Sequence, residues 1–260
     1  MSSPFVARID LYPLKAFDTV VVETATVLPS GALEGDRRWA FVDAQERFVN
    51  GKRHAETHRI RTAVDPVGRT ATFDGLTFSL DRDVAAVEAW VSARLQTPVR
   101  LREHPAAGFP DDTDAPGPTV VATATLAAVA GWFDLSLEVT RARFRANLEI
   151  GGVAAFWEDA WYGATCQLGA VPLVLVNPCA RCIVPSRDPR TGEAFPGFQK
   201  QFAERRRAAL APDVDPAPFD HYYRLAVNTR LATASRGGTI RVGDPVAVLT
   251  TPFLETPCPS

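Results

Sequence analysis

Residues 166–182 read CQLGAVPLVLVNPCARC, and this stretch indicates the fold class most directly. Valine and leucine fill its middle, as in a β-strand, and Pro178 ends the apolar run. A C-x-x-C pair, Cys179 and Cys182, follows at once. The stretch therefore predicts a strand that delivers two thiols to a loop.

Similar short runs, rich in Val, Thr, Phe and Tyr and separated by turn residues, occur along the whole chain. They are 6–14, 20–28, 37–44, 71–80, 99–104, 143–152, 224–233 and 244–250. Within 71–80, the pair Asp74-Gly75 predicts a type I′ hairpin turn. Many short strands with few helices predict a mainly β protein, a barrel or sandwich rather than a doubly wound α/β fold.

Three segments have the spacing or composition of helices. Asp81 can cap the first, in which apolar residues at 84, 87, 91 and 95 share one face. Thr123 or Thr125 can begin the second, TLAAVAGWF. The third is FQKQFAERRRAAL at 198–210, and its three consecutive arginines, 205–207, are predicted to form a solvated face.

A proline- and glycine-rich stretch without periodicity, residues 104–118, divides the chain. Such a composition is typical of a linker or surface loop. We therefore predict one β-rich domain over residues 1–103 and a second over residues 119–254.

The charge balance narrows the function classes. Thirty acidic and 28 basic residues give a net charge of −2, which excludes a generally basic, nucleic-acid-coating surface. The basic residues are 25 Arg and 3 Lys. The longest apolar runs are far shorter than the ~20 residues of a membrane span, and the N-terminus lacks a secretory signal pattern. We expect a cytoplasmic protein with reduced cysteines and with neither a membrane nor a nucleic-acid partner.

The C-x-x-C pair allows four interpretations from the residues alone. A thioredoxin-like site should begin a helix, which Pro185 and the turn residues after it disfavour. A zinc site needs a second ligand pair, which Cys166 and Cys258 do not form. A single thiolate could serve as a soft ligand or nucleophile beside Arg181. A buried structural thiol is the remaining alternative.

Two histidines, His54 and His58, have the i, i+4 spacing of a metal pair on a helix. The surrounding GKRHAETHRIR offers no third ligand, so a surface turn is the favoured interpretation.

PCARC followed by DPRTGE, residues 178–193, resembles the signature of the MOSC family, the C-terminal domain of molybdenum cofactor sulfurases. The pattern is most similar to the mitochondrial amidoxime-reducing components and to bacterial proteins of the YcbX type. Further stretches resemble family motifs in the family's order: LYPLK at 11–15, GDRRWAFVD at 35–43, RFRAN at 143–147, FWEDAW at 156–161 and RVGDPVAVL at 241–249.

The resemblance implies an N-terminal MOSC-associated β-barrel followed by the MOSC β-barrel, with a molybdopterin-type molybdenum cofactor. It implies that Cys182 ligates the metal, and that Arg181 and Asp188 tune the site or deliver a proton. Positions that would contact the cofactor are Lys15, Arg37, Thr125, Arg145 and Asn147. A soft thiolate suits a molybdenum that cycles between oxidation states, and Arg and Lys suit a phosphate.

The chain departs from the family pattern at three small residues. Ala16 and Ala122 replace hydroxyl residues, and Ala146 replaces the proline of R-F-R-P-N. The two lost hydroxyls remove possible hydrogen bonds to a pterin or phosphate.

The resemblance implies a molybdenum-dependent oxidoreductase that reduces N-hydroxylated or other N-oxygenated compounds by two electrons. No plant-type ferredoxin cysteine pattern follows the last predicted strand, so a separate flavin or iron–sulfur protein is expected to donate the electrons. The alternative is a carrier of the molybdenum cofactor or of persulfide sulfur on Cys182, without turnover of a small molecule.

Overall fold

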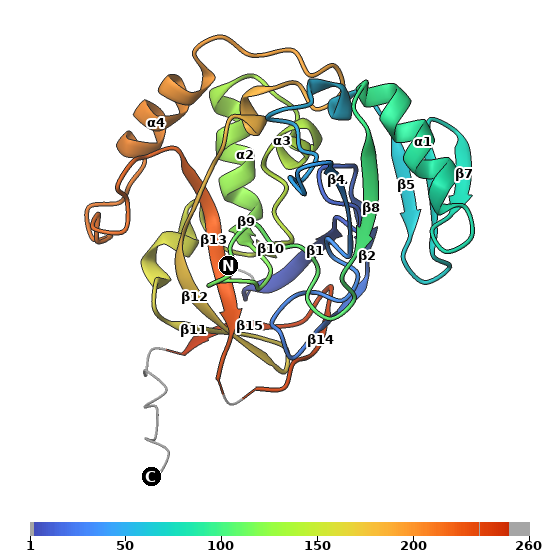
Figure 1. Cartoon of the computed structure of the whole chain (residues 1–260). Coiled ribbons are helices and arrows are strands. Elements are labelled where there is room, and N and C mark those ends of the chain that lie inside the picture. Colours follow the sequence, from blue (N-terminus) through green and yellow to red (C-terminus); the bar gives the residue numbers. More distant parts are fainter. Residues whose placement is uncertain (1–2, 234, 250–260) are drawn as a thin grey trace.

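The computed structural model describes residues 3–233 and 235–249 (Figure 1). Its largest sheet has eight strands in the order β15-β11-β12-β13-β9-β10-β1-β2. Neighbouring strands are antiparallel except for the parallel pair β9 and β10. The strands are β1 (Phe5–Leu11), β2 (Val20–Val22), β9 (Val120–Ala122), β10 (Leu148–Gly151), β11 (Thr165–Leu168), β12 (Val171–Ala180), β13 (Arg224–Leu231) and β15 (Val246–Leu249).

Three smaller sheets complete the β structure. They pair β3 (Thr24–Val27) with β14 (Gly238–Arg241), β4 (Trp39–Asp43) with β8 (Val99–Glu103), and β5 (Thr62–Asp65) with β6 (Thr70–Phe73) and β7 (Leu76–Ser79). The helices are α1 (Val84–Leu95), α2 (Thr123–Trp132), α3 (Leu137–Phe144) and α4 (Phe198–Ala208), with 3-10 turns η1 (Ala55–His58), η2 (Trp157–Trp161) and η3 (Val184–Ser186).

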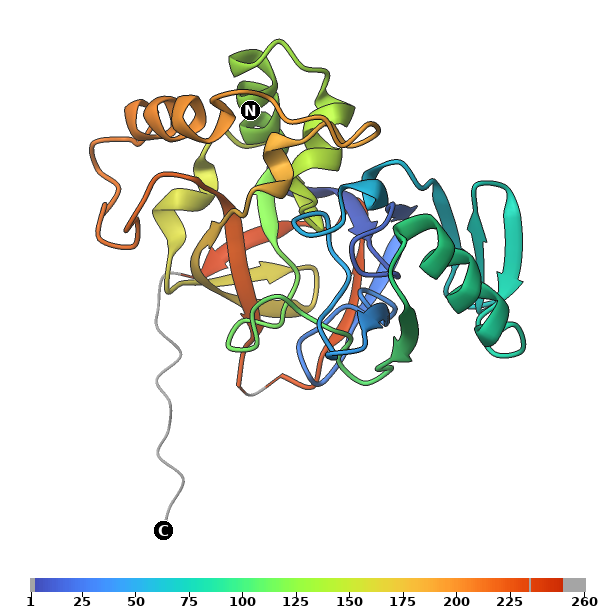
Figure 2. The ribbon, with the colours of Figure 1, turned by 45° about the horizontal axis from the view of Figure 1, so that its top comes forward.

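Helices and strands are segregated in space. Figures 1 and 2 show α2, α3 and α4 together at one end of the large sheet, whereas α1 lies beside β7 and β8 on the opposite side of the molecule. Phenylalanines join the helical end, because Phe144 of α3 packs with Phe198 and Phe202 of α4. A second aromatic core, with Phe17, Phe41 and others, fills the space under α1.

The large sheet contains strands from both sides of residues 104–118, the stretch that the sequence predicts as a linker. Ile9 of β1 pairs with Leu148 of β10, and β3 from the first half pairs with β14 near the end of the chain. Strands from both sides of residues 104–118 are thus hydrogen-bonded to each other. The division into domains 1–103 and 119–254 remains a prediction. The mainly β class is confirmed. Besides the ladders of the large sheet, an isolated bridge between Phe5 and Pro245, with backbone hydrogen bonds between Val6 and residues 243–244, joins the start of β1 to the chain before β15.

Most predicted elements are present, with three differences in detail. The Asp74-Gly75 hairpin forms, with both residues at positive φ. The α1 helix buries Val87, Val91 and Leu95 as predicted. Its N-cap position, however, is Asp83, because Asp81 instead pairs with Arg69.

The second difference lies in the segment 143–152, predicted as one strand. Its first two residues end α3, which Ser136 caps by accepting a hydrogen bond from the backbone N–H of Val139 at 3.2 Å. Only Leu148–Gly151 form the strand. The third difference is Arg206 of α4, which is 2% exposed and not part of a solvated face.

Candidate cofactor site

The C-x-x-C pair lies at the end of β12, the strand predicted from the sequence. Val171, Leu173 and Leu175 alternate into the core, as the strand period requires. The pairing with β13 shifts twice, between Leu175 and Asn177 and between Pro178 and Ala180. Such irregularities bend a strand and redirect its side chains. Cys179 lies in the second shift, within β12, and Cys182 lies two residues beyond the end of the strand.

The two thiols remain partly exposed, unlike Cys166. Cys166 is completely buried, and burial raises the pKa of its thiol to about 12. Cys182 Sγ accepts a hydrogen bond from the backbone N–H of Val184 at 3.4 Å, and the neighbouring Ile183 is exposed. Only the short η3 turn follows, which agrees with the sequence argument against a thioredoxin-like helix.

The motifs LYPLK and GDRRW lie side by side. Backbone hydrogen bonds run from Arg37 N to Tyr12 O, from Trp39 N to Pro13 O and from Lys15 N to Trp39 O, at 2.8–3.0 Å. This pairing brings together the side chains of Lys15 and Arg37, which lie 22 residues apart in the sequence.

The charges of Lys15 and Arg37 have acidic neighbours. Lys15 is mostly buried and donates to Asp111 Oδ1 at 2.6 Å and to the carbonyl of Phe109 at 2.8 Å. Burial lowers the pKa of Lys15, although Asp111 opposes the shift. Burial also acts against the charge of Arg37, but Asp36 and Asp111 outweigh it and raise the pKa of Arg37.

Arg145 is a cation without an acidic partner among the described residues. It occupies the C-cap of α3, and its guanidinium carbon lies 4.1 Å from the centre of the Tyr12 ring. Burial lowers the pKa of Arg145, and the positive charge of Arg37 adds to this shift. A guanidinium nevertheless stays charged at neutral pH, so this side chain supplies an unneutralised positive charge.

Backbone strain accompanies two of these cations. Arg37 has φ of 47° and Arg145 has φ of 53°, and the nearby Ala16 has φ of 76°. L-residues avoid this left-handed region at a cost of ~1 kcal/mol or more each, and such strain is concentrated at functional sites.

These cations and the cysteine loop lie close to one another. Cys179 lies within electrostatic range of Arg37, and the charges of Arg187 and Arg145 both act on His58. A Cβ on Gly51 would meet His58 Nε2 at 2.5 Å and Val184 Cγ2 at 3.3 Å, so His58 packs beside the loop that follows Cys182.

Two of the predicted cofactor residues, Thr125 and Asn147, are buried and hydrogen-bonded within the protein. Thr125 is completely buried, donates to Glu158 Oε2 at 3.0 Å and accepts from Phe156 N at 2.6 Å. Asn147 is also completely buried. Its Oδ1 accepts from Thr119, and its Nδ2 donates to the carbonyl of Asp10 at 3.0 Å. These hydrogen bonds engage both side chains within the protein.

Arg181 and Asp188 differ in how far hydrogen bonds within the protein occupy their side chains. Arg181 Nε donates to the carbonyl of Leu225 at 2.9 Å, whereas its buried Nη2 has no hydrogen-bond partner among the described residues. Asp188 Oδ1 accepts from the backbone N–H groups of Arg190 and Thr191 at 2.9 Å each. Burial opposes the shift, but these bonds hold the pKa of Asp188 below its usual value, so it is poorly suited to donate a proton.

The sequence does not single out Tyr12, which supports Arg145, or Asp111, in front of Lys15. The surface-turn interpretation of His58 does not predict its place beside the cysteine loop. Tyr12 lies inside the quoted LYPLK motif. Asp111 lies in the stretch interpreted as a linker, where no periodicity marks a contact. The Nε2 atom of His58 is buried without a hydrogen-bond partner among the described residues.

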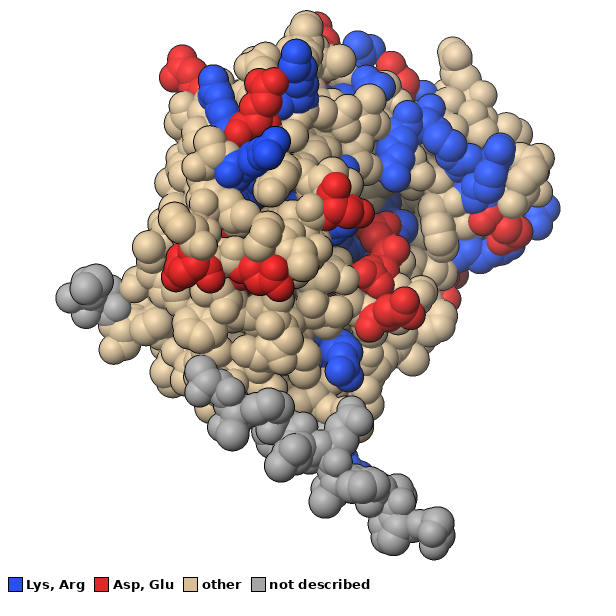
Figure 3. Space-filling model, turned by 90° about the vertical axis from the view of Figure 1, so that its left-hand side faces the viewer, with Lys and Arg blue, Asp and Glu red and all other residues tan. Residues whose placement is uncertain are grey.

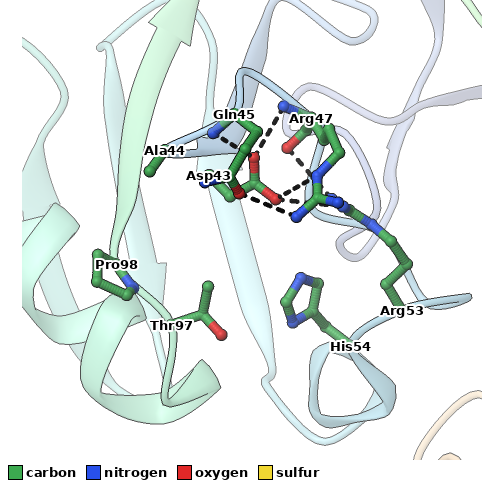
Figure 4. Close-up of a pocket in the computed structure, with 8 residues that line it drawn as sticks. All are labelled: Asp43, Ala44, Gln45, Arg47, Arg53, His54, Thr97 and Pro98. Atoms are coloured by element: carbon green, nitrogen blue, oxygen red, sulfur yellow. Dashed lines mark hydrogen bonds and ion pairs between the residues drawn. The ribbon is translucent and has the colours of Figure 1, made fainter.

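A surface hollow of about 380 Å³ lies elsewhere in the N-terminal half and is lined by Asp43, Arg47, Arg53, His54 and neighbouring residues (Figure 4). Asp43 accepts from the backbone N–H groups of Gln45 and Arg47 and from the guanidinium groups of Arg47 and Arg53. Its carboxylate is therefore engaged in holding a turn, and the hollow contains none of the predicted site residues.

The distribution of charge on the surface agrees with the near-zero net charge. On the face drawn in Figure 3, basic and acidic side chains are both present among large uncharged areas, with a group of basic side chains toward the upper right.

The residues present fit an anionic, sulfur-ligated cofactor in part. Arg145 offers an unneutralised guanidinium, and Lys15 and Arg37 lie close by, a set suited to a phosphate. Cys182 offers a partly exposed thiol as one soft ligand. Within residues 3–233 and 235–249, no group of three or more His, Cys, Asp or Glu side chains could hold a metal ion by itself. A metal here would depend on ligands that the cofactor brings.

Two family models together match almost the whole described chain. The MOSC domain matches residues 119–247, and the MOSC N-terminal beta barrel domain matches residues 3–139. The chain belongs to the MOSC family, and the resemblance seen in the motifs is confirmed.

Individual relatives are distant. Mitochondrial amidoxime-reducing component 1 of Homo sapiens is 25% identical over 94% of this chain and 82% of its own length. The protein of the same name from Mus musculus is 32% identical, but over 44% of this chain and 32% of its own. The solved structure of the YUAD protein from Bacillus subtilis covers 95% of this chain and 96% of its own at 10% identity, with a TM-score of 0.43. In the described part of the chain, no helix combines the length and apolar character of a membrane span.

Proposed function

We propose that the chain is a molybdenum-cofactor-dependent oxidoreductase that reduces N-oxygenated compounds by two electrons. The observation that carries the proposal is the unneutralised guanidinium of Arg145, which lies with Arg37 and Lys15 near the cysteine loop. Membership of the MOSC family and relatives named amidoxime-reducing component support the same class.

When bound, the cofactor would supply the redox chemistry, and Cys182 would hold its metal through a thiolate. Arg145, Arg37 and Lys15 would hold its phosphate end. Arg181 would direct its unpartnered Nη2 toward the ligand side, and Asp188 would keep the loop after Cys182 in its turn. Thr125 and Asn147 would act indirectly, by fixing α2 and the chain beside β10.

The substrate and the electron donor are parts of this proposal. An N-hydroxylated or other N-oxygenated small molecule is the expected substrate, and a separate flavin or iron–sulfur protein is the expected donor. The compartment stays a prediction, because relatives whose names begin with "mitochondrial" do not support a cytoplasmic location.

A carrier role is the second candidate. Cys182 is partly exposed and lies beside the exposed Ile183, so its thiol could also carry a persulfide to a partner. The two functions differ in what the purified protein should contain.

The test is elemental analysis of the full chain purified from a host that makes the molybdenum cofactor. We expect about one molybdenum per chain in the wild type and in Cys179→Ala, and almost none in Cys182→Ser. The wild type, once chemically reduced, should also reduce an N-hydroxylated amidine.

Each outcome separates the candidates. Protein free of molybdenum but with labile sulfur on Cys182 would support the carrier. Equal molybdenum in Cys182→Ser and the wild type would refute ligation by this residue. The molybdenum content of a second molybdenum-cofactor protein made in the same host should be measured as a control. A low content in that protein would show that the host supplies too little cofactor.

A further inference from the structure

Asp111 is placed among the three cations that we assign to the phosphate end of the cofactor. Its Oδ1 lies 2.6 Å from Lys15 Nζ, and its Oδ2 lies 3.9 Å from Arg37 Nε. The protein atoms around Asp111 would raise the pKa of its carboxyl, but the charges of Arg37, Lys15 and Arg145 outweigh this effect and lower it. The carboxylate is therefore an anion at neutral pH, in the field of all three cations.

The exposure of these side chains differs sharply. The side chain of Lys15 is 10% exposed, whereas that of Asp111 is 77% exposed. The carboxylate thus reaches the buried ammonium from the solvent side. An ion pair with one exposed partner contributes little, typically ~0–1 kcal/mol, so a stronger anion can replace it at low cost.

Other contacts fix the chain on both sides of Asp111. Phe109 N donates to the carbonyl of Arg37 at 2.9 Å, and the ring of Phe109 packs on Phe48 at 5.3 Å. On the other side, Asn228 Nδ2 donates to Asp112 Oδ2 at 3.2 Å. The position of the loop therefore does not depend on the carboxylate of Asp111.

We propose that Asp111 is an internal competitor, a carboxylate that pairs with Lys15 and, in addition to Asp36, acts on Arg37 until a phosphate group with two negative charges displaces it. This inference rests on the proposed function, because it assigns a regulating group to the same anion site. A single negative charge gains little by replacing another, whereas a phosphate dianion gains from Lys15, Arg37 and Arg145 together. Asp111 therefore makes the site selective for dianions.

The test uses the full chain purified from a host that cannot make the cofactor, with inorganic phosphate as the probe. Isothermal titration at low ionic strength and pH 8 gives its dissociation constant. We expect Asp111→Asn to bind phosphate about tenfold more tightly than the wild type, because a repelling charge is removed while the loop stays in place. The same substitution should increase the affinity for formate, a monoanion, by a smaller factor than the affinity for phosphate.

Asp114→Asn is the matched control, since Asp114 is an exposed aspartate of the same loop that has no salt bridge among the described residues. It should bind phosphate within about twofold of the wild type. The double variant Lys15→Met/Asp111→Asn should not show the tighter phosphate binding that we expect of Asp111→Asn. Equal or weaker binding by Asp111→Asn, or no phosphate binding by any variant, would overturn the inference.

The phosphate titration and the molybdenum analysis test the two proposals separately. Molybdenum in the wild-type protein without a gain in Asp111→Asn refutes the competitor alone. A gain in Asp111→Asn, with no molybdenum in protein from a cofactor-producing host, refutes the oxidoreductase alone and leaves a dianion site controlled by Asp111.

Discussion

The guanidinium of Arg206 and the carboxylate of Asp159 form an ion pair inside the protein, with Nη2 2.7 Å from Oδ1 and 2.6 Å from Oδ2. Their side chains are 2% and 3% exposed. The rings of Phe156 and Phe219 flank the guanidinium, with centres 4.6 and 5.0 Å from its carbon. The pair joins α4 to the η2 turn, and Glu158 of the same turn accepts a hydrogen bond from Thr125 of α2.

Replacing Arg206 by Met should lower the free energy of unfolding by about 3–5 kcal/mol, because it removes the cation beside the buried charge of Asp159 and leaves it the hydroxyl of Tyr162. Urea unfolding followed by circular dichroism measures the change. Arg207→Met, one position away on the exposed side of α4, should change it by less than about 0.5 kcal/mol. Adding Asp159→Asn to Arg206→Met should restore part of the loss, and equal effects of the two single arginine changes would contradict the role of the pair.

The sequence predicts those features that depend on local pattern. Alternation identifies β12 and the hairpin at Asp74-Gly75, and helical spacing identifies the face of α1 that buries Val87 and Val91. The spacing of Phe198, Phe202 and Arg206 at i, i+4 and i+8 could have shown that this arginine shares the apolar face of α4. Arg206 stands between two other arginines, and a run of like charges is usually interpreted as a solvated face.

Features that depend on long-range contacts could not be predicted in the same way. Nothing local shows that β1 pairs with β10, or that Asp111 of a supposed linker meets Lys15. The family motifs place both Arg37 and Arg145 among the expected cofactor contacts, and in the structure the charge of Arg37 acts on Arg145. The same patterns do not separate a residue that faces a ligand from one that holds the backbone, as Asn147 does.

Glu158 should make stability depend on pH. It is 1% exposed, and burial, aided by the charge of Asp159, raises its pKa from 4.5 to about 7. Between these values the folded chain keeps a proton that the unfolded chain has lost, so the contribution of Glu158 to stability falls as the pH rises and is fully lost above about 7. Glu158→Gln should therefore match the wild type near pH 4.5 and exceed it by up to ~3 kcal/mol at pH 8.

Urea unfolding of both proteins at pH 4.5, 6 and 8 measures this difference. Gln can still accept the hydrogen bonds from Ala122 N and Thr125 Oγ1, so the packing should persist. Glu204→Gln, on the exposed side of α4, should show no such trend. A difference between Glu158→Gln and the wild type that stays constant with pH would show that Glu158 titrates normally.

Asn147 should prove to be structural. Asn147→Ala removes the acceptor for the Thr119 backbone and hydroxyl and the donor to Asp10, all of them at a completely buried position. We expect a loss of about 2–4 kcal/mol in the free energy of unfolding, because buried backbone groups lose their partners. Unchanged stability together with lost phosphate binding would instead assign Asn147 directly to the ligand.

Arg145 should prove to bind the ligand. Its guanidinium has no acidic partner among the described residues and only stacks on Tyr12, so Arg145→Met should cost less than about 1 kcal/mol in stability. The cofactor-free variant should nevertheless bind inorganic phosphate at least tenfold more weakly, because a charge-assisted contact to the dianion is lost. The wild-type affinity should fall steeply with added salt, and that of Arg145→Met less steeply. Arg100→Met, an exposed arginine on β8, should leave both stability and phosphate binding unchanged, and a phosphate affinity of Arg145→Met equal to the wild type would exclude this residue from the anion site.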